Sequence, residues 1–259
     1  MRVAVLQPAM HWQPVGNLRE TLRALERAAA AGAGLLVGPE LGLTGFHRQV
    51  TRHFGAGALA AELAQLQAAC ARLQVAAAVG LPWALDDGRA LNSHLYIDAQ
   101  GRLAGRVDKQ GLTPSEATVF AAGGPRAWTA LAGVALSSVL CRETLDGEAL
   151  LPEWQASAPP GLRVLLWPSY IADGDTGNAD EADLVQRYRQ GACAMARALQ
   201  AWVLQCNWPV SLNEPAARGF GASIVVAPDG RLVAELARDE PGLWCLALAA
   251  GAASITRLG

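Results

Sequence analysis

The chain has 259 residues, of which 52% are hydrophobic and 17% charged, and its formal net charge is −2. A charged fraction below the usual ~25% fits a compact body with much buried surface, not a disordered or fibrous chain. The small net charge and the lack of long Lys or Arg runs argue against nucleic acid or an anionic membrane as main partner. No uncharged apolar stretch is long enough to span a bilayer.

Five cysteines occur, at positions 70, 141, 193, 206 and 245, and no two of them form a CxxC pair. The odd count and the spacing argue against a disulfide framework or a zinc site and favour free thiols in a reducing compartment. The first residues, Met1–Pro8, are soon too polar for a signal peptide. We therefore expect a soluble, cytoplasmic protein, with residues 1–259 forming one domain.

The first third of the chain alternates between predicted strands and helices. Asn17 and Glu20 form a pair similar to a capping box, so we expect a helix to begin there and to end at Gly32 or Gly34. Around it lie the other predicted elements: strands at Arg2–Gln7, Leu35–Val37 and Val75–Leu81, and a helix at Ala58–Leu73. This alternation predicts parallel strands covered by helices.

Two similar phrases later in the chain each predict a strand, a tight turn and a second strand. Tyr96–Ala104 contains Gln100-Gly101, and Val225–Val233 contains Asp229-Gly230. The predicted elements between them are the strand that ends at Cys141, a short helix, the strand Arg163–Trp167, the helix Glu181–Leu199 and the strand Ala201–Cys206. The segment Gly174–Asp183 lacks the carboxylate spacing of a calcium loop and is interpreted as a mobile loop near the mouth of the site.

Cys141 differs from the other four cysteines, which lie inside apolar patterns typical of buried thiols. It ends the apolar run Val134–Cys141 and is followed at once by the polar segment Arg142–Glu148. A thiol at such a strand-to-helix turn lies at the strand end, where backbone N–H groups lower its pKa and stabilise an oxyanion. Cys141 is therefore a candidate nucleophile.

Three charged residues complete a candidate acyl-transfer site. Glu40 closes the apolar run Gly34–Glu40 and is either a general base in a dry pocket or a loop residue that caps a helix or pairs with Arg. Lys109 and Glu116 share one segment, and each residue taken alone also fits an ordinary structural role. Lys109 would then be a solvated hairpin charge, and Glu116 a first-turn residue after Thr113 and Pro114.

Four segments, in order, give the chain a resemblance to the nitrilase superfamily, the carbon–nitrogen hydrolases. They are Gly38-Pro-Glu-Leu41 with Thr44-Gly-Phe46, Lys109–Glu116, Val139–Glu143, and Asn207 followed by Gly221–Gly230. The resemblance implies a four-layer α-β-β-α sandwich of α/β class and a homodimer. It implies that Cys141 attacks the substrate carbon and that Glu40 takes the thiol proton and later activates water. Lys109 and the N–H of Arg142 would stabilise the oxyanion, and Glu116 would position the substrate and hold Lys109.

The chain also departs from the family pattern. Arg142 and Glu143 stand where the family often has an aromatic residue and Asp, and Gly111 stands where it often has His. Arg142 either binds an acidic substrate group or pairs with Glu143, Asp146 or Glu148. Trp167, Tyr170 and Trp208 follow strand-like runs and are either pocket-lining or core and interface aromatics.

Three functional hypotheses follow. The first is a hydrolase of a small amide or carbamoyl compound, with a nitrile less favoured, that needs no metal or organic cofactor. The second is an acyltransferase that passes the same thioester to an amine. The third is a non-catalytic interaction protein of the same fold, which the complete set Glu40, Lys109, Glu116 and Cys141 argues against.

Overall fold

The computed structural model describes residues 1–172, 179–249 and 252–258, which form two β-sheets and the helices that cover them. The strands of the first sheet are β1 (Arg2–Gln7), β2 (Leu35–Val37), β3 (Ala76–Ala84), β4 (Ala90–Ile97), β5 (Leu103–Asp108), β6 (Phe120–Ala121), β13 (Gly242–Ala249) and β14 (Ala252–Leu258). The strands of the second sheet are β7 (Thr129–Leu131), β8 (Val134–Ser138), β9 (Arg163–Ser169), β10 (Trp202–Asn207), β11 (Ile224–Val226) and β12 (Leu232–Glu235). The helices are α1 (Pro14–Ala30), α2 (Ala60–Leu73), α3 (Gly147–Gln155) and α4 (Ala179–Leu199), with 3₁₀ turns η1 (Val50–His53), η2 (Glu116–Thr118) and η3 (Cys141–Asp146).

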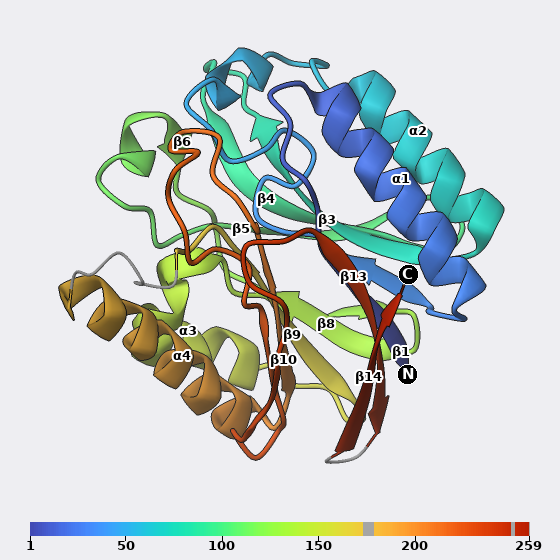
Figure 1. Cartoon of the computed structure of the whole chain (residues 1–259), viewed down its shortest axis with the longest axis vertical. Helices are drawn as coiled ribbons and strands as arrows, with labels where there is room; N and C mark the ends of the chain where they lie inside the picture. The colour runs from blue at the N-terminus through green and yellow to red at the C-terminus, as the bar shows by residue number, and fades with distance from the viewer. Residues whose placement is uncertain (173–178, 250–251, 259) are drawn as a thin grey trace.

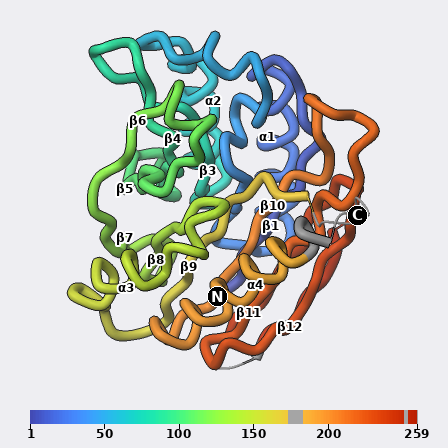
Figure 2. The backbone as a smooth tube through the Cα atoms, turned by 90° about the vertical axis from the view of Figure 1, so that its left-hand side faces the viewer, coloured from blue at the N-terminus to red at the C-terminus, as the bar shows by residue number. Residues whose placement is uncertain are grey.

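The two sheets lie face to face between two pairs of helices, as Figure 1 shows. The first sheet has the order β14-β13-β1-β2-β3-β4-β5, with β6 paired to β4, and the second has the order β12-β11-β10-β9-β8-β7. Figure 2 views the molecule from the side of α3 and α4, which lie over the second sheet. The predicted four-layer α-β-β-α sandwich is confirmed.

Alternating side chains of the inner strands fill the layers on either side of each sheet. In β1, Val3 and Val5 belong to the core between the sheets, whereas Ala4 and Leu6 belong to the core beneath α1 and α2. Successive side chains of a strand point to opposite faces, so a strand covered on both sides is apolar throughout. This burial is why the strands appear in the sequence as continuous apolar runs.

Strands β1, β2 and β3 run parallel to one another, and so do β8, β9 and β10. In parallel sheets, the loops that follow the carboxyl ends of the strands gather at one edge. Glu40 follows β2, Cys141 follows β8 and Tyr170 follows β9. The topology therefore places these three segments at the same end of the sandwich.

The expected start of the first helix is wrong by three residues. Helix α1 begins at Pro14, a residue type pre-organised for a first helical position, and Asn17 lies inside the helix. The buried Asn17 side chain instead holds the preceding loop, because its Oδ1 accepts from the N–H of His11 at 2.8 Å and its Nδ2 donates to the His11 carbonyl at 3.0 Å. The pattern indicated a backbone-binding Asn but not which turn it serves.

The loop predicted at Gly174–Asp183 is wrong in its second part, because helix α4 already begins at Ala179. Its first part, residues 173–178, lies outside the described residues.

Candidate active site

The structure brings the four candidate residues together from separate parts of the chain. Lys109, which follows β5, reaches Glu40 after β2 and Glu116 at the start of η2. Its Nζ lies 2.7 Å from Glu40 Oε1 and 2.5 Å from Glu116 Oε1. The Lys109 and Glu40 side chains are 1% and 0% exposed, so this cation is neither solvated nor free to leave its two carboxylates.

Cys141 shares a cavity with Lys109 and Glu116. This cavity, of about 470 Å³, is otherwise lined mainly by apolar and aromatic side chains, among them Phe46, Tyr170, Val185 and Phe220. It has the size and character of a small-molecule site, with few polar groups in an apolar wall. We call it the Cys141 cavity.

The backbone at Cys141 adopts an unusual conformation. Its φ is +51°, in the left-handed region that non-glycine residues seldom occupy. Cys141 is also the first residue of η3, so the N–H of Arg142 lies in a first turn, where backbone donors lack partners one turn earlier. The thiol lies at the cavity wall, where its Sγ is 3.8 Å from the Tyr170 carbonyl oxygen.

Burial dominates the titration of the Cys141 thiol. Desolvation and the charge of Glu40 raise its pKa, and the charge of Lys109 lowers it less, so the resting group is a protonated thiol. Such a thiol needs a base before it attacks a substrate.

Glu40 has the properties of that base. Burial raises its pKa to about 6 against the opposing effect of Lys109, so the carboxylate is ionised at neutral pH yet takes a proton readily. Burial alone would lower the pKa of Lys109, but the neighbouring carboxylates of Glu40 and Glu116 oppose it, and that pKa is raised. Lys109 therefore stays a cation.

Two residues hold Glu40 in place: Asn92, which the sequence analysis missed, and Trp208, one of the aromatics that it singled out. Asn92, on β4, donates through Nδ2 to Glu40 Oε1 at 2.8 Å, and the indole N–H of Trp208 donates to the Glu40 carbonyl at 2.7 Å. Glu40 Oε2 has no hydrogen-bond partner among the described residues. One oxygen of the carboxylate is thus fixed, and the other is available to accept a proton.

Close backbone packing also positions the Glu40 loop. A Cβ atom at Gly80, on β3, would collide with the backbone from Pro39 to Leu41. Leu41 itself has a φ of +51°. The turn after β2 therefore fits only against a glycine on the neighbouring strand.

Glu116 forms a reciprocal capping pair with Thr113. Its Oε2 accepts from the Thr113 N–H at 2.8 Å, and the Thr113 hydroxyl accepts from the Glu116 N–H at 3.2 Å. The predicted helix start is thus present, as the 3₁₀ turn η2, and the same carboxylate binds Lys109 through Oε1. The structural and site roles of Glu116 coexist.

The three tentative binding residues have different positions. Trp167 does not line the Cys141 cavity; it is buried beneath the thiol and donates from its indole N–H to the Cys141 carbonyl at 2.8 Å. Tyr170 lines the cavity and stacks on Phe46, with ring centroids 4.5 Å apart. Arg142 also lines the cavity, but its Nη1 and Nη2 donate to the Asp146 carboxylate at 3.1 and 3.3 Å.

Asn207, at the end of β10, ties together two loops of this region. Its Oδ1 accepts from the Ile171 N–H at 2.9 Å, and its Nδ2 donates to the carbonyls of Ile171 and Gly221 at 2.7 and 2.9 Å. All polar atoms of the buried amide are used. Asn207 thus fixes the loop after β9 that carries Tyr170.

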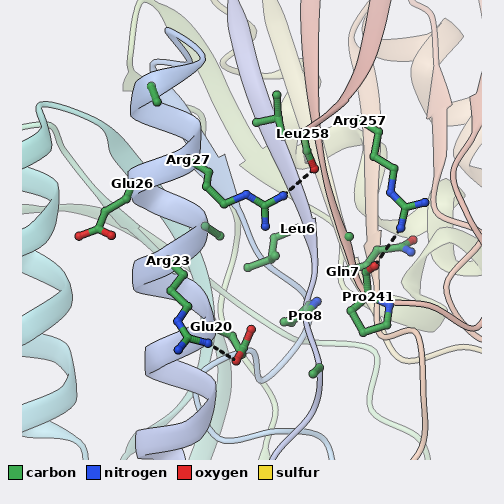
Figure 3. Close-up of a pocket in the computed structure, with 14 residues that line it drawn as sticks. Leu6, Gln7, Pro8, Glu20, Arg23, Glu26, Arg27, Pro241, Arg257 and Leu258 are labelled. Carbon is green, nitrogen blue, oxygen red and sulfur yellow. Dashed lines mark hydrogen bonds and ion pairs between the residues drawn. The ribbon is translucent and has the colours of Figure 1, made fainter.

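A larger hollow of about 820 Å³ lies between α1 and the strands β13 and β14 (Figure 3). None of the four candidate residues lines it. Its charged side chains are partnered: Arg23 with Glu20, Arg257 with Glu240, and Arg27 with the Leu258 carbonyl. It offers no nucleophile and no unpartnered buried charge, so chemistry is expected at Cys141.

The described residues contain neither a metal-binding cluster nor a membrane-spanning helix. No group of three or more His, Cys, Asp and Glu side chains among them is arranged to hold a metal ion. No helix within ranges 1–172, 179–249 and 252–258 combines the length and apolar character needed to cross a bilayer.

Comparison with known proteins agrees with this geometry. The model of the carbon-nitrogen hydrolase family matches residues 2–255. No protein with a curated description matches the chain significantly. Among solved structures, the NitN amidase from Nesterenkonia sp. AN1 matches with a TM-score of 0.79 and 25% identity, over 96% of this chain and 93% of that one.

Two variants of the Nesterenkonia amidase also match. A cysteine-to-alanine variant in complex with butyramide has a TM-score of 0.77 and 25% identity, over 95% of this chain and 89% of that one. A glutamate-to-glutamine variant, which shows Michael addition of acrylamide at the active site cysteine, matches in fold with a TM-score of 0.78 and 24% identity, over 96% and 93% of the two chains.

The chain belongs to the carbon–nitrogen hydrolase family and is an enzyme whose fold is that of the amidases of the nitrilase superfamily.

Proposed function

We propose that this enzyme hydrolyses a small, uncharged carboxylic amide through an acyl-thioester on Cys141, releasing ammonia. The observation that carries the proposal is Lys109, which lies buried between Glu40 and Glu116 in contact with the Cys141 cavity. A thiol, a base with a free oxygen, and a fixed cation are the groups that acyl transfer at a carbonyl requires.

In the first half of the reaction, Glu40 Oε2 takes the Cys141 proton as the sulfur bonds to the carbonyl carbon. Lys109 Nζ and the Arg142 N–H donate to the oxyanion that develops on the carbonyl oxygen. The C–N bond then breaks, and the proton held by Glu40 passes to the departing nitrogen. Ammonia leaves, and the acyl group remains on sulfur.

In the second half, a water molecule attacks the thioester while Glu40 accepts its proton. The same donors stabilise the second oxyanion, the C–S bond breaks, and the proton returns from Glu40 to the sulfur. The acid is released and the thiol is restored. Glu116 touches no reacting atom in this scheme; it holds Lys109 in place.

The cavity wall supports an apolar acyl group. Phe46, Tyr170 and Phe220 form a continuous aromatic surface, with Tyr170 and Phe220 centroids 5.1 Å apart. The Arg142 charge is paired with Asp146, so it gives little reason to select an acidic substrate. Butyramide, the compound bound by the related Nesterenkonia variant, is the kind of substrate we propose.

The test is ammonia release from butyramide, acrylamide and matched acidic, carbamoyl and nitrile compounds, with Cys141→Ala as control. We expect the parent to release ammonia from the uncharged amides without an added acceptor and Cys141→Ala to release none. Release that requires an added amine would favour the acyltransferase. Equal release by both proteins would refute the assignment of Cys141.

We further propose a cytoplasmic homodimer, on the basis of the free thiols and the family resemblance. Light scattering coupled to gel filtration measures the mass, and a monomer at micromolar concentration would contradict the dimer.

A further inference from the structure

A second buried ion pair lies directly behind the nucleophile, outside the set of four. It joins Glu143, in η3, to Arg126, in the segment before β7. Both side chains are fully buried, and Arg126 lies over the Trp154 ring, 5.4 Å from its centroid. Neither residue lines the Cys141 cavity.

The Glu143 carboxylate binds two separate loops through their backbones. On one side, Oε2 accepts from the N–H of Leu140, the residue before the nucleophile, at 2.7 Å. On the other, Oε1 accepts from the N–H groups of Gln110 and Gly111, which directly follow Lys109, at 2.7 and 2.8 Å. One rigid group thus fastens the loop of the thiol to the loop of the cation.

Close packing around Gly111 fixes the distance between the Lys109 loop and η3. A Cβ atom there would collide with the Asp146 carboxylate and crowd Glu143 Cγ, so the Lys109 loop lies directly against η3. The Gly111 carbonyl also accepts from Arg142 Nη1 at 3.3 Å. The three sequence departures at Gly111, Arg142 and Glu143 therefore form one interlocked contact.

We propose that Glu143 is a positioning residue, which sets the distance between Cys141 and Lys109 by clamping their two loops, while Arg126 serves only as its counter-ion. The inference rests on the proposed function, because it concerns the approach of the Lys109 ammonium to the sulfur and the oxyanion. The rate of attack depends steeply on the distance between the reacting groups, and a misplacement of ~1 Å costs on the order of 10²-fold in rate.

The two partners of this ion pair allow a matched test. Glu143→Gln and Arg126→Met each break the pair, and each leaves a buried partner without its counter-charge, so both should lower the unfolding temperature. Only Glu143→Gln also breaks the clamp. A glutamine amide presents one acceptor oxygen and one NH₂ group. Its NH₂ group therefore faces a backbone N–H of one of the two loops, and two donors do not form a hydrogen bond.

We expect Glu143→Gln to lower kcat for butyramide by roughly 10²-fold with KM changed by less than about threefold. Arg126→Met should keep kcat within about threefold, because the three backbone N–H bonds to the Glu143 carboxylate remain and still hold both loops. Glu153→Gln is the control. Its carboxylate accepts from the Arg126 N–H and from the Gln110 side chain but from neither clamped loop backbone, and parental kinetics are expected.

A second readout does not depend on the substrate. The rate at which iodoacetamide modifies the Cys141 peptide, followed by mass spectrometry against pH, reports the influence of Lys109 on the thiol. The profile should move to higher pH in Glu143→Gln and stay parental in Arg126→Met. If the parent releases no ammonia from any amide, the proposed function fails, but this comparison still decides the clamp.

The double variant Arg126→Met with Glu143→Gln separates positioning from stability. Removing both charges should recover most of the unfolding temperature and leave kcat low. Three outcomes would each overturn the proposal. They are equal losses of kcat in the two single variants, recovery of kcat together with the unfolding temperature in the double variant, and an alkylation profile that does not move in Glu143→Gln. Should Glu143→Gln not fold, Glu143→Asp keeps the charge and shortens the reach; parental kcat in that variant would also overturn it.

Discussion

Two buried clusters of charge lie on either side of Cys141, and they differ in how completely their oxygens are bonded. In the Glu143 cluster, both carboxylate oxygens are bonded, to three backbone N–H groups and Arg126. In the Lys109 cluster, Glu40 keeps one oxygen without a partner among the described residues, and Lys109 contacts the cavity. A carboxylate with both oxygens bonded holds backbones in place, whereas a carboxylate with one unbonded oxygen can still accept a proton.

The Glu40 carboxylate also has a raised proton affinity. Burial raises the pKa of Glu40 to about 6 because only Lys109 and Asn92 oppose it. A carboxylate poised there can exchange a proton with a thiol near neutral pH, at some cost to stability. We therefore expect substitutions in the Lys109 cluster to have large effects on the reaction rate. Changing the residues of that cluster one at a time tests this difference between the two clusters.

The largest effect after loss of the thiol itself is expected for Lys109→Ala. This change removes an oxyanion donor and leaves two buried carboxylates facing one another, so kcat should fall by roughly 10²–10³-fold. Steady-state kinetics with butyramide provide the measurement. A loss of tenfold or less would mean that the cation is structural, as in the Glu143 cluster.

Asn92→Ala should have an intermediate effect. It removes the fixed donor to Glu40 Oε1, a hydrogen bond to a charged group worth about 1.5–3 kcal/mol, which corresponds to a loss of roughly tenfold to a hundredfold in kcat/KM. Because this donor lowers the pKa of Glu40, its loss should also move the acid limb of the pH–rate profile upward. An unmoved limb would show that Asn92 does not tune the base.

The parental pH profile carries the next prediction. Glu40 must be ionised to accept the thiol proton, so kcat/KM should rise with pH through about 6. Stability should move in the opposite direction. The pKa of Glu40 in the folded protein lies above its ordinary value of 4.5, so the free energy of unfolding contains a favourable contribution from its protonation. This contribution is complete below pH 4.5 and is lost, by about 2 kcal/mol, as pH rises through about 6. Urea unfolding of the parent and Glu40→Gln across this range checks it, since the variant should lack the dependence.

The smallest effect is expected for Arg142→Ala. Its side chain is held by Asp146 at the cavity wall, and the pair is partly exposed, so kcat/KM for an uncharged amide should change by less than about threefold. The backbone N–H at this position is unaffected by the change. A much larger loss confined to amides that carry a carboxylate would assign Arg142 to substrate recognition.

The sequence by itself determined the layered fold and predicted the four residues of the candidate site. Each inner strand is buried on both faces, so it is locally visible as an apolar run, and helix periodicity marks the layers outside. Glu40, Lys109 and Cys141 were found because each lies at or just after such a run, where a polar residue is locally conspicuous. Glu116 was singled out through the segment that it shares with Lys109 and the family resemblance, because its capping pattern with Thr113 by itself indicated only a helix start.

Only the tertiary structure decided which side chains bind one another. Asn92 meets Glu40 across 52 residues of sequence, and Arg126 reaches Glu143 from a segment without a motif. Trp167 lies under the thiol because successive residues of a strand face opposite sides. The positive φ at Leu41 and Cys141 has no local signal, since neither residue type favours it; the packing of neighbouring backbones, as at Gly80, imposes it. Strand register and loop packing are long-range properties, and they convert a recognisable set of residues into a site.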